Sequence, residues 1–577
     1  MCGIFAQITH SQNFCQLENL TQRLREANAT RGPDARKSCC ISFHSLSLEL
    51  FSSELRLRGN TRVVQPHQNI YGDILCWNGE VRRLVSADEN DGIKLFEQLH
   101  PLETGEQVRD FFAYIEGPYA FVFYNATSQK LFFSRDPLGR RSLLIHRPSA
   151  TNPYFLLASV SAGSDPGCSF EELETGHIYC LDLTLLSKAD DVNDHDNFLR
   201  LNHSQRAGYS DSRINTTLPP DDLPILPSNN LDIIPSWLAL PVEELISQLE
   251  HSVMLRVRDI PQDPSLRGQT RVAVLFSGGI DSTILTLLAD RHVPRDEPID
   301  LLNVAFENPR KIKVQKDGNI INPNKKKAKS KVVLSGSPDQ SGDSNGLPST
   351  DYMVPDRVTG LQEVEELRRL CPERVWNFVE VNVPYHESQS ARLRVEGLMN
   401  PVRTVMDLSL ALALYFASRG IGQIRPKAGA DPIPYTSPAR VLINGLGSDE
   451  LLGGYGRHRS AYNSGGWAAV IEELQLEIDR IPIRNLGRDD RVISSHGKET
   501  RHPFLSLDVV SFLAKLSVQH KMDPRLPVGL GDKMLLRLAA RKLGLVEASG
   551  RKKRAMQFGS HSARMDGDEK GDKLLEG

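Results

Sequence analysis

Apolar and polar positions alternate with a period of two along much of the first 185 residues, as in the runs AFVFY and KLFFSRD. Turn-forming residues separate these runs, and the combination predicts a series of short strands. The segment CQLENLTQRLREAN instead repeats its apolar residues at helical spacing. We therefore expect residues 2–185 to form a layered α+β domain.

The pattern changes after this region. Residues 186–235 are rich in Asp, Asn and Pro, which predicts a linker. Beyond it, apolar runs such as RVAVLFSGG and ARVLINGLG end in glycine-rich turns that open helices. This order is typical of a parallel α/β sheet, so residues 236–560 are expected to form a second domain of that class.

Two polar segments are expected to lie outside the packed cores. Residues 309–350 contain KKKAKSK and SGSPDQSGDSNG, which cannot bury an apolar surface and predict a disordered insertion. A solvated loop is favoured there over a contact with nucleic acid. Residues 561–577 predict a disordered tail.

Bulk composition excludes several classes of protein. The chain has 577 residues, a net charge of -3 and 40% hydrophobic residues, the balance of an ordinary globular protein. No apolar run approaches the roughly 20 residues of a membrane span, and no signal-peptide pattern is visible. The eight cysteines show no pairing pattern and are interpreted as reduced thiols. We expect a cytoplasmic protein with neither a membrane nor a nucleic acid as partner.

Cys2 directly follows the initiator methionine. Once Met1 is removed, this residue carries a thiol that titrates near about 8.5 and an α-amine that titrates near roughly 7.7–8.0. The amine can then take the thiol proton, which gives a nucleophile with its own base. From this position alone, a chance small residue after the initiator is the alternative.

The stretch SGGIDS lies between a predicted strand and a predicted helix. Backbone N–H groups at Gly278 and Gly279 can approach a phosphate there, helped by the helix N-terminus. Ser277 and Ser282 add hydroxyl donors, and Asp281 can hold a magnesium ion against the phosphates. The Walker pattern GxxxxGK[ST] is absent. The form SGGxDS looks like the PP-loop of AMP-forming ATP pyrophosphatases; a chance tight turn is the alternative.

MCGI at the start and SGGIDS in the middle together resemble the class II glutamine amidotransferases of the asparagine synthetase family. The resemblance covers nearly the whole chain apart from the insertions and the tail. Further matches are RGPD, WNGE, NDG, SRDPLGRRSLL, NGLGSDELLGGYGRHR, RDDRV, KETRHPF and KMLLR. Within that family, the chain most closely resembles the branch called asparagine synthetase domain-containing proteins. The family's fold is an αββα Ntn-type domain followed by an α/β PP-loop domain of the adenine nucleotide α-hydrolase-like type.

The resemblance implies a glutaminase site in the first domain. Cys2 would attack the side-chain amide of glutamine, form a thioester and release ammonia. Asn78 and Gly79 would form the oxyanion hole, where an amide donor and a backbone N–H suit the developing charge. Asn78-Gly79 is equally a hairpin-turn sequence.

The same resemblance implies residues that bind glutamine. Glu80 and Asp91 would hold its α-amine, although Asp91 could be only a helix cap. An arginine would bind its carboxylate as a forked pair. Both Arg56 and Arg58 are available in ELRLRGN, and Arg58 is favoured.

In the second domain the resemblance implies that ATP activates a carboxylate as its adenylate, with release of pyrophosphate, and that ammonia then displaces AMP. For asparagine synthetase the substrate is aspartate and the product asparagine. The residues implied to line the nucleotide pocket are Phe276, Val304, Asn444 and Gly445, in addition to the SGGIDS loop. Asp281 and Asp449 are the expected Mg²⁺ ligands, with helix capping as the alternative for Asp449. Arg488, Lys533 and Arg537 either face the phosphates or lie on solvated helix faces.

Two departures from the family pattern bear on activity. Working synthetases carry a glutamate where this chain has Leu446, and a leucine cannot act as a base or bind ammonium. Glu307 or Asp407 could substitute for it. General acid–base help is worth about 10²–10⁴ in rate, so its loss slows a reaction without abolishing it.

The second departure concerns the family's late catalytic lysine. In RKKRAMQF its position is taken by Ala555, with Lys552 and Lys553 just upstream. A shift of one or two residues would bring Lys553 into the synthetase site. A surface basic run, such as a nuclear localisation signal, is the alternative.

The leading hypothesis is a glutamine-hydrolysing ligase that makes asparagine from aspartate with ATP and Mg²⁺. One alternative keeps both half-reactions but uses a different carboxylate. The other is a non-catalytic regulatory or interaction protein.

Overall fold

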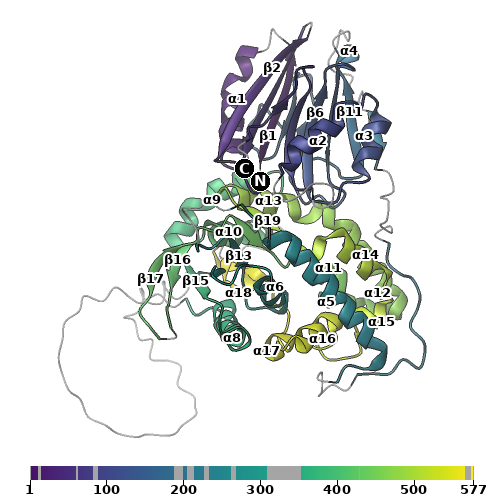
Figure 1. Cartoon of the computed structure of the whole chain (residues 1–577), viewed down its shortest axis with the longest axis vertical. Coiled ribbons are helices and arrows are strands. Elements are labelled where there is room, and N and C mark those ends of the chain that lie inside the picture. Colours follow the sequence, from purple (N-terminus) through teal and green to yellow (C-terminus); the bar gives the residue numbers. More distant parts are fainter. Residues whose placement is uncertain are drawn as a thin grey trace, which may run out of the picture.

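Three β-sheets organise the described part of the chain, two stacked on each other in the N-terminal half and one in the C-terminal half (Figure 1). This computed structural model describes residues 2–10, 14–43, 45–59, 63–81, 89–186, 199–203, 213–226, 233–261, 268–307, 352–427, 429–565 and 573–575. The predicted insertion at 309–350 lies outside the described residues.

The two N-terminal sheets are antiparallel. The first has the order β10-β8-β9-β1-β3-β2 and the second β12-β11-β7-β6-β5-β4. The strands of the first sheet are β1 (Gly3–His10), β2 (Ala35–Phe43), β3 (Leu46–Glu54), β8 (Leu144–His146), β9 (Phe155–Ala158) and β10 (Glu171–Glu172). Those of the second are β4 (His67–Gln68), β5 (Ile74–Gly79), β6 (Tyr119–Asn125), β7 (Lys130–Arg135), β11 (His177–Asp182) and β12 (Leu199–Asn202).

The alternation along each strand explains the layers. Ile4, Ala6 and Ile8 of β1 point into the core between the two sheets. Phe5 points the other way and packs under α1 (Phe14–Ala29). On the outer face of the second sheet lie α2 (Asp91–Leu99) and α3 (Gly105–Phe112). The predicted layered α+β architecture is present as helix, sheet, sheet, helix.

One strand lies where the sequence predicts a linker. Within 186–235, β12 pairs antiparallel with β11 and extends the second sheet. The four-residue run LRLN carries an apolar position at Leu201, whose side chain is buried. A strand of four residues changes the composition of this polar segment too little to be predicted from composition.

In the described residues the C-terminal sheet has seven strands in the order β17-β16-β15-β14-β13-β18-β19. The neighbouring strands β15, β14, β13, β18 and β19 are parallel to one another. Their bounds are β13 (Val272–Leu275), β14 (Ile299–Phe306), β15 (Trp376–Val383), β18 (Val441–Ile443) and β19 (Glu499–Arg501). The antiparallel edge consists of β16 (Ile421–Ile424) and β17 (Ile433–Thr436). The parallel core agrees with the predicted α/β class.

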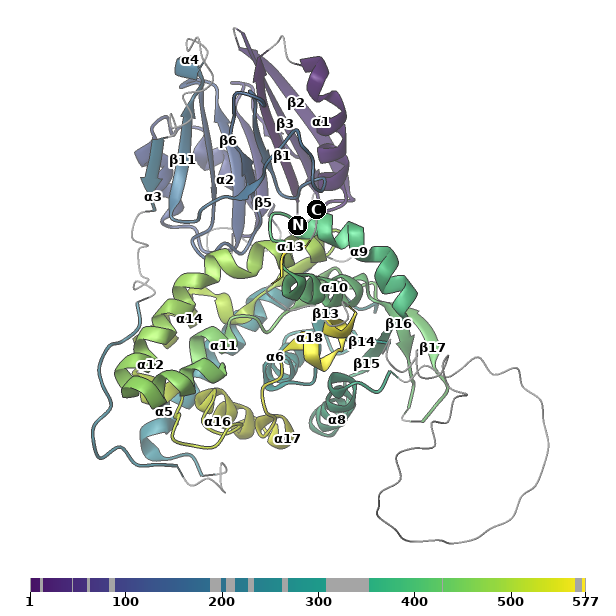
Figure 2. The same ribbon diagram turned by 180° about the vertical axis from the view of Figure 1, so that it is seen from behind.

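Helices cover both faces of this sheet (Figure 2). Val272 and Val274 of β13 pack toward α5, α6 and α16, whereas Ala273 and Leu275 pack toward α9 and α10. The helices and 3-10 turns are α4 (Leu183–Leu186), α5 (Ser236–Val257), α6 (Ile280–Asp290), α8 (Pro355–Leu370), α9 (Tyr385–Met399), α10 (Val405–Arg419), α11 (Ser448–Leu452), α12 (Gly456–Arg484), α13 (Leu486–Ser494), η3 (Pro503–Leu505), α14 (Leu507–Lys515), α15 (Val518–Lys521), α16 (Met534–Lys542), α17 (Val546–Ser549), α18 (Met556–Gly559) and η4 (Ser562–Arg564). No helix among the described residues is long and apolar enough to cross a membrane.

Part of the predicted disordered tail is ordered. Val405 donates to the carbonyl of Lys573 at 3.0 Å, and Leu575 donates to the carbonyl of Arg403 at 2.8 Å. These two bonds flank an antiparallel bridge between Thr404 and Leu574. The segment 573–575 is therefore held against the start of α10 by backbone hydrogen bonds. Side-chain composition does not predict such bonds.

Candidate active sites

Cys2 lies directly before β1 in a small cavity of about 40 Å³. Its backbone N–H donates to Oδ1 of Asn78 at 3.0 Å, and Nε2 of Gln65 lies 3.6 Å from its sulfur. Gln65 is itself held by the N–H of Trp77, which donates to its Oε1 at 2.8 Å. Burial raises the pKa of the Cys2 thiol to about 11, and the positive N-terminus opposes that shift.

Asn78 and Gly79 occupy the end of β5, beside Cys2. Because Oδ1 of Asn78 accepts from Cys2, its Nδ2 remains a donor. This Nδ2 is buried and has no hydrogen-bond partner among the described residues. An unsatisfied buried donor is costly in a folded protein and is suited to an oxygen that arrives with a substrate.

Glu80, Asp91 and Arg58 line the same cavity. Arg58 lies 3.4 Å from Glu80. Asp91 accepts from the N–H of Val81 at 2.9 Å, and burial raises its pKa to about 6 against the effect of that bond. Arg56 also lines the cavity, but its Nε faces Glu54 at 3.6 Å. Both arginines thus line the cavity beside a glutamate, and the preference for Arg58 stays a prediction.

Two lining residues come from the C-terminal sheet and escape sequence reasoning. Arg501 of β19 lies 3.5 Å from Glu80 and 2.6 Å from Glu499. Glu499 also pairs with Arg141 at 3.1 Å. Burial alone would raise the pKa of Glu499, but Arg141 and Arg501 hold it below its ordinary value. Both residues lie in the motif KETRHPF, but the motif does not indicate that Arg501 contacts Glu80.

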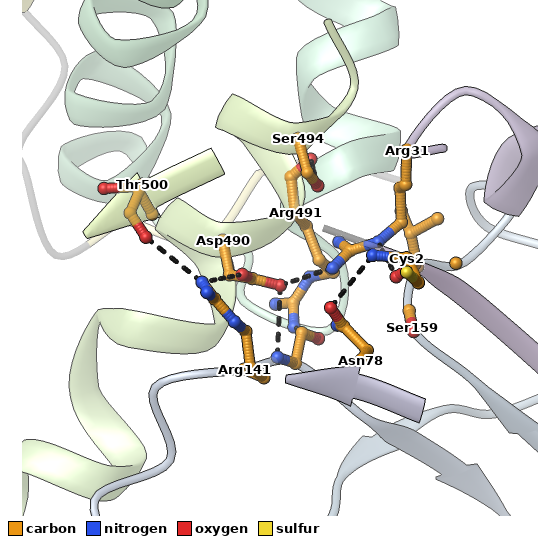
Figure 3. Close-up of polar contacts among 12 residues, drawn as sticks. Cys2, Arg31, Asn78, Arg141, Ser159, Asp490, Arg491, Ser494 and Thr500 are labelled. Atoms are coloured by element: carbon orange, nitrogen blue, oxygen red, sulfur yellow. Dashed lines mark hydrogen bonds and ion pairs between the residues drawn. The ribbon is translucent and has the colours of Figure 1, made fainter. Parts of the chain in front are cut away.

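A buried charge network joins this cavity to α13 (Figure 3). Arg31 donates from Nε to the carbonyl oxygen of Cys2 at 3.3 Å and pairs with Asp490 of α13 at 2.7 Å. Asp490 also lies 3.6 Å from Arg141, which donates to the carbonyl of Thr500 at 3.1 Å. The network ties the position of Cys2 to the docking of the two halves of the chain.

A second, larger cavity of about 750 Å³ opens at the carboxyl ends of β13, β14 and β18. It adjoins a cavity of about 270 Å³ at the SGGIDS loop, and the two share Ser277, Asp281, Asp356, Lys553 and Arg554. The sequence-predicted residues along the larger cavity are Phe276, Ser277, Asp281, Ser282, Val304, Asn444, Gly445, Asp449 and Lys553. Gly278, Gly279, Lys533, Arg537 and Lys552 line the smaller one.

The SGGIDS loop approaches α8 closely. Gly278 has φ +74°, and a Cβ there would lie 2.5 Å from the backbone nitrogen of Gly360. Only glycine fits this position. The loop leads into α6, whose N-terminus has no side-chain cap, so its N–H groups are available to a phosphate.

Lys533 lies between the two carboxylates that the sequence assigns to Mg²⁺. Its ammonium is 2.7 Å from Asp281 and 2.7 Å from Asp449, and Lys553 lies 3.1 Å from Asp449. Burial would raise the pKa of Asp449, but the two lysines lower it to about 2. No cluster of three or more acidic, His or Cys ligands occurs among the described residues. Two carboxylates still suit Mg²⁺ when nucleotide phosphates supply further oxygens.

The structure distinguishes among the remaining predicted residues. Lys552 lines only the smaller cavity, so Lys553, which lines both, is the better placed lysine. Arg488 and Arg537 are buried and not on solvated helix faces. Arg488 lines the larger cavity, where it pairs with Asp407 and Asp489.

Leu446 lines the larger cavity at the turn before α11. Of the two carboxylates suggested as substitutes, Asp407 lines the cavity and Glu307 does not; Glu307 accepts from the N–H of Tyr385. Glu450 also lines it, with the hydroxyl of Tyr455 donating to it at 2.5 Å. Sequence reasoning missed Glu450 as a pocket carboxylate, although it stands in the motif GSDE.

Comparison with known proteins supports one family. The model for the family described as asparagine synthase matches residues 263–318 and 462–571. Asparagine synthetase domain-containing protein 1 of Homo sapiens is 35% identical over 98% of this chain and 96% of its own. The relative CG17486 of Drosophila melanogaster is 32% identical over the full length of both chains. YML096W of Saccharomyces cerevisiae is 32% identical over 95% of this chain and 90% of its own.

Among solved structures, glutamine phosphoribosylpyrophosphate amidotransferase from B. subtilis covers 52% of this chain and 66% of its own at 14% identity, with a TM-score of 0.26. That score supports no structural argument, whereas the sequence relatives are similar from end to end. The chain therefore belongs to the family of asparagine synthetase domain-containing proteins.

Proposed function

We propose that this protein is a glutamine-hydrolysing, ATP-dependent ligase that converts a carboxylic acid into its amide. The observation that carries the proposal is the pair of sites in one chain. A buried nucleophile lies beside an unsatisfied amide donor, and a glycine-rich phosphate loop lies beside the buried Lys533. Glutamine and ATP are the substrates that these two sites suit, and aspartate is the acceptor that family membership suggests first.

At the first site, removal of Met1 frees the α-amine of Cys2 to accept the thiol proton. The thiolate attacks the side-chain carbonyl carbon of glutamine, and Nδ2 of Asn78 and the N–H of Gly79 bind the resulting oxyanion. The protonated amine then gives its proton to the departing ammonia, which leaves a thioester. Water hydrolyses the thioester to glutamate and restores the thiol.

At the second site, an oxygen of the acceptor carboxylate attacks the α-phosphorus of ATP, and pyrophosphate leaves. The loop N–H groups and the ammonium groups of Lys533 and Lys553 bind the phosphate charge. Asp281 and Asp449 would hold the Mg²⁺ that offsets the remaining charge. Ammonia then attacks the acyl carbon of the adenylate and AMP leaves, which gives the amide.

Leu446 sets the expected rate. Because this position supplies no acid or base, we expect turnover to be slower by about 10²–10⁴ than with a positioned carboxylate. The described lining holds six carboxylates, and two of them, Asp407 and Glu450, are engaged by Arg488 and by Tyr455.

The test is a mass-spectrometric assay with ATP, Mg²⁺, aspartate and either glutamine or ammonia, in which glutamate, asparagine, AMP and pyrophosphate are measured together. We expect AMP and amide to form in step, and Cys2→Ala to retain only the ammonia-dependent reaction. Glutamate without AMP would leave the first half-reaction intact and reject aspartate as acceptor. Absence of every product, in folded protein whose intact mass shows that Met1 is gone, would favour a non-catalytic role.

A further inference from the structure

A row of apolar side chains runs along α10 on one wall of the larger cavity. Met406, Leu410 and Leu414 stand four residues apart, so they share one face of the helix, and all three line the cavity. Ile483, in the last turn of α12, adds a fourth apolar side chain to the lining. Met406 is 46% exposed and Ile483 is 72% exposed, so a molecule in the cavity can reach both. These four residues are called the apolar wall below.

Helix α13 links this wall to the N-terminal half of the chain (Figure 1). Arg488 of α13 lines the cavity and pairs with Asp407 of α10. Two residues further on, Asp490 pairs with Arg31 of the N-terminal half at 2.7 Å. On the proposed function, ammonia released at Cys2 reaches the cavity from the α13 side. The acyl group that it attacks therefore belongs beside the apolar wall.

The nucleotide is expected in another part of the cavity. Phe276, Val304 and Asn444, which the family resemblance implies for the nucleotide pocket, lie toward the carboxyl ends of β13, β14 and β18. The triphosphate faces the smaller cavity, where Lys533 and Lys552 add positive charge. The apolar wall comes from helices instead, so an apolar group other than the base can fill the space beside it.

The lining of the larger cavity carries no excess of positive charge. Its described residues include six carboxylates and five cationic side chains: Asp281, Asp356, Asp407, Asp449, Glu450 and Asp489, with Arg480, Arg484, Arg488, Lys553 and Arg554. A second anionic group on the acceptor would thus meet more negative than positive charge in this lining.

The arginines around the apolar wall are matched by carboxylates as well. Arg480 and Arg484 pair with the fully buried Glu477 at 3.3 and 2.9 Å. The described ion pairs of this region join four guanidinium groups to four carboxylates: Arg457, Arg480, Arg484 and Arg488 with Asp407, Glu473, Glu477 and Asp489. A second anion could bind an arginine only by displacing one of these carboxylates, which would leave a charge unpaired.

We propose that the acceptor is a carboxylic acid with an uncharged, apolar body, which packs on the apolar wall while its single carboxylate is adenylated. This inference rests on the proposed function and names the substrate class of the same site. Straight-chain and arylalkyl monocarboxylic acids belong to the class. Aspartate, which family membership suggests first, is the poorer acceptor because its second carboxylate finds no unmatched cation in the described lining.

The experiment is ATP–pyrophosphate exchange, which measures adenylate formation without glutamine or ammonia. Hexanoate is compared with adipate, the diacid of the same length, and 3-phenylpropionate is compared with aspartate. We expect each monoacid to exceed its partner at least ten-fold in kcat/KM, because a second carboxylate loses water without gaining a cation. Exchange with adipate and aspartate that equals or exceeds exchange with the monoacids would overturn the inference.

The double variant Met406→Gln/Ile483→Gln tests the apolar wall itself. Both side chains are exposed, so we expect the variant to fold. The KM for hexanoate should rise at least ten-fold, because methylene groups lose an apolar contact, and the KM for ATP should stay within two-fold. A folded variant with an unchanged KM for hexanoate would overturn the inference. A rise in the KM for ATP alone would also overturn it, since the wall would then bind the nucleotide base.

Leu393→Gln is the matched control. Leu393 is 82% exposed on α9 and lies outside the described linings of both cavities. This variant makes the same kind of apolar-to-amide change away from the site. It should leave the KM values for hexanoate and ATP unchanged, and equal effects of the control and the double variant would overturn the inference.

If no acid supports exchange, the proposed function fails, and binding still tests the apolar wall. Calorimetric titration of hexanoate in the presence of MgATP should show binding to the unmodified protein that weakens at least ten-fold in the double Gln variant. Adipate should bind at least ten-fold more weakly than hexanoate. Absence of binding at millimolar hexanoate, or equal binding of hexanoate and adipate, would overturn the inference.

Discussion

The guanidinium of Arg501, on the last strand of the C-terminal sheet, lies 3.5 Å from the carboxylate of Glu80 in the Cys2 cavity. Glu80 also faces Arg58 at 3.4 Å. A residue of the candidate synthetase half is thus part of the wall around the candidate glutaminase nucleophile, and a change in how the halves dock acts directly on that wall.

Glu80→Gln should raise the KM for glutamine by about 10- to 100-fold, because a charge-assisted contact to the substrate amine is lost. Ammonia-dependent amide formation should stay within about three-fold. Initial rates with each nitrogen source measure both effects. Equal losses in the two reactions would show that Glu80 acts on the fold and not on glutamine.

Glutamine binding should weaken in acid through Asp91. Its pKa is raised to about 6 by burial, and only the carboxylate can hold an ammonium group. The KM for glutamine should therefore rise as the pH falls below about 6. Asp91→Asn should have a high KM that is independent of pH in this range, and a KM that titrates identically in both proteins would contradict the assignment.

The same shift has a consequence for stability. Because the folded-state pKa of Asp91 is above the unfolded value, the protonated carboxyl stabilises the fold at low pH and this contribution is lost as the pH rises toward about 6. The difference in unfolding free energy between wild type and Asp91→Asn should fall by up to about 1.4 kcal/mol per pH unit between roughly 4 and 6. Urea unfolding of both proteins at a series of pH values measures it.

Gln65 should assist the Cys2 thiolate, since its Nε2 faces the sulfur at 3.6 Å. Gln65→Glu keeps an acceptor for the N–H of Trp77 but places a negative charge beside the sulfur. We expect glutamine hydrolysis to slow by at least ten-fold and the pH profile of Cys2 alkylation by iodoacetamide to move upward. Alkylation of the exposed Cys40, followed by mass spectrometry in the same sample, is the internal control. An unchanged Cys2 profile would remove Gln65 from this role.

Lys533→Met should expose the mutual repulsion of Asp281 and Asp449. Loss of a buried ammonium between two carboxylates typically costs about 3–5 kcal/mol, so the melting temperature should fall by several degrees. Mg²⁺ should restore part of this loss in the variant and have little effect on wild type, as checked by calorimetry with and without EDTA. No response of the variant to Mg²⁺ would contradict a metal site at these carboxylates.

Leu446→Glu should raise the rate of amide formation from ammonia by at least ten-fold, because it places an ionisable group in the cavity lining. Leu446→Gln has nearly the same shape without the charge and should give no increase. A gain with both variants would indicate a change in packing, and no gain with either would show that Leu446 is not what limits the reaction.

The parts of the first cavity that sequence predicts are those carried by short continuous motifs. Asn78, Gly79 and Glu80 are consecutive at one strand end, so placing the strand places all three. Arg501 and Glu499 enter the cavity only because two distant parts of the chain dock, and no local pattern encodes that contact.

Buried charges were equally hard to assign. Helical spacing shows which face of a helix is apolar but not what packs against its polar positions, so Lys533 was compatible with solvent or phosphate. The structure buries it between two carboxylates. The sharing of Glu477 by Arg457, Arg480 and Arg484 is likewise visible only in the folded structure.

The backbone pairing of Lys573 and Leu575 with the start of α10 limits where the protein can be engineered. That helix carries Met406 and Asp407 into the larger cavity. We therefore expect a purification tag or a short deletion that displaces 573–575 to alter the larger cavity without any substitution in its lining, and a tag fused before Cys2 to block the amine that the proposed glutaminase needs.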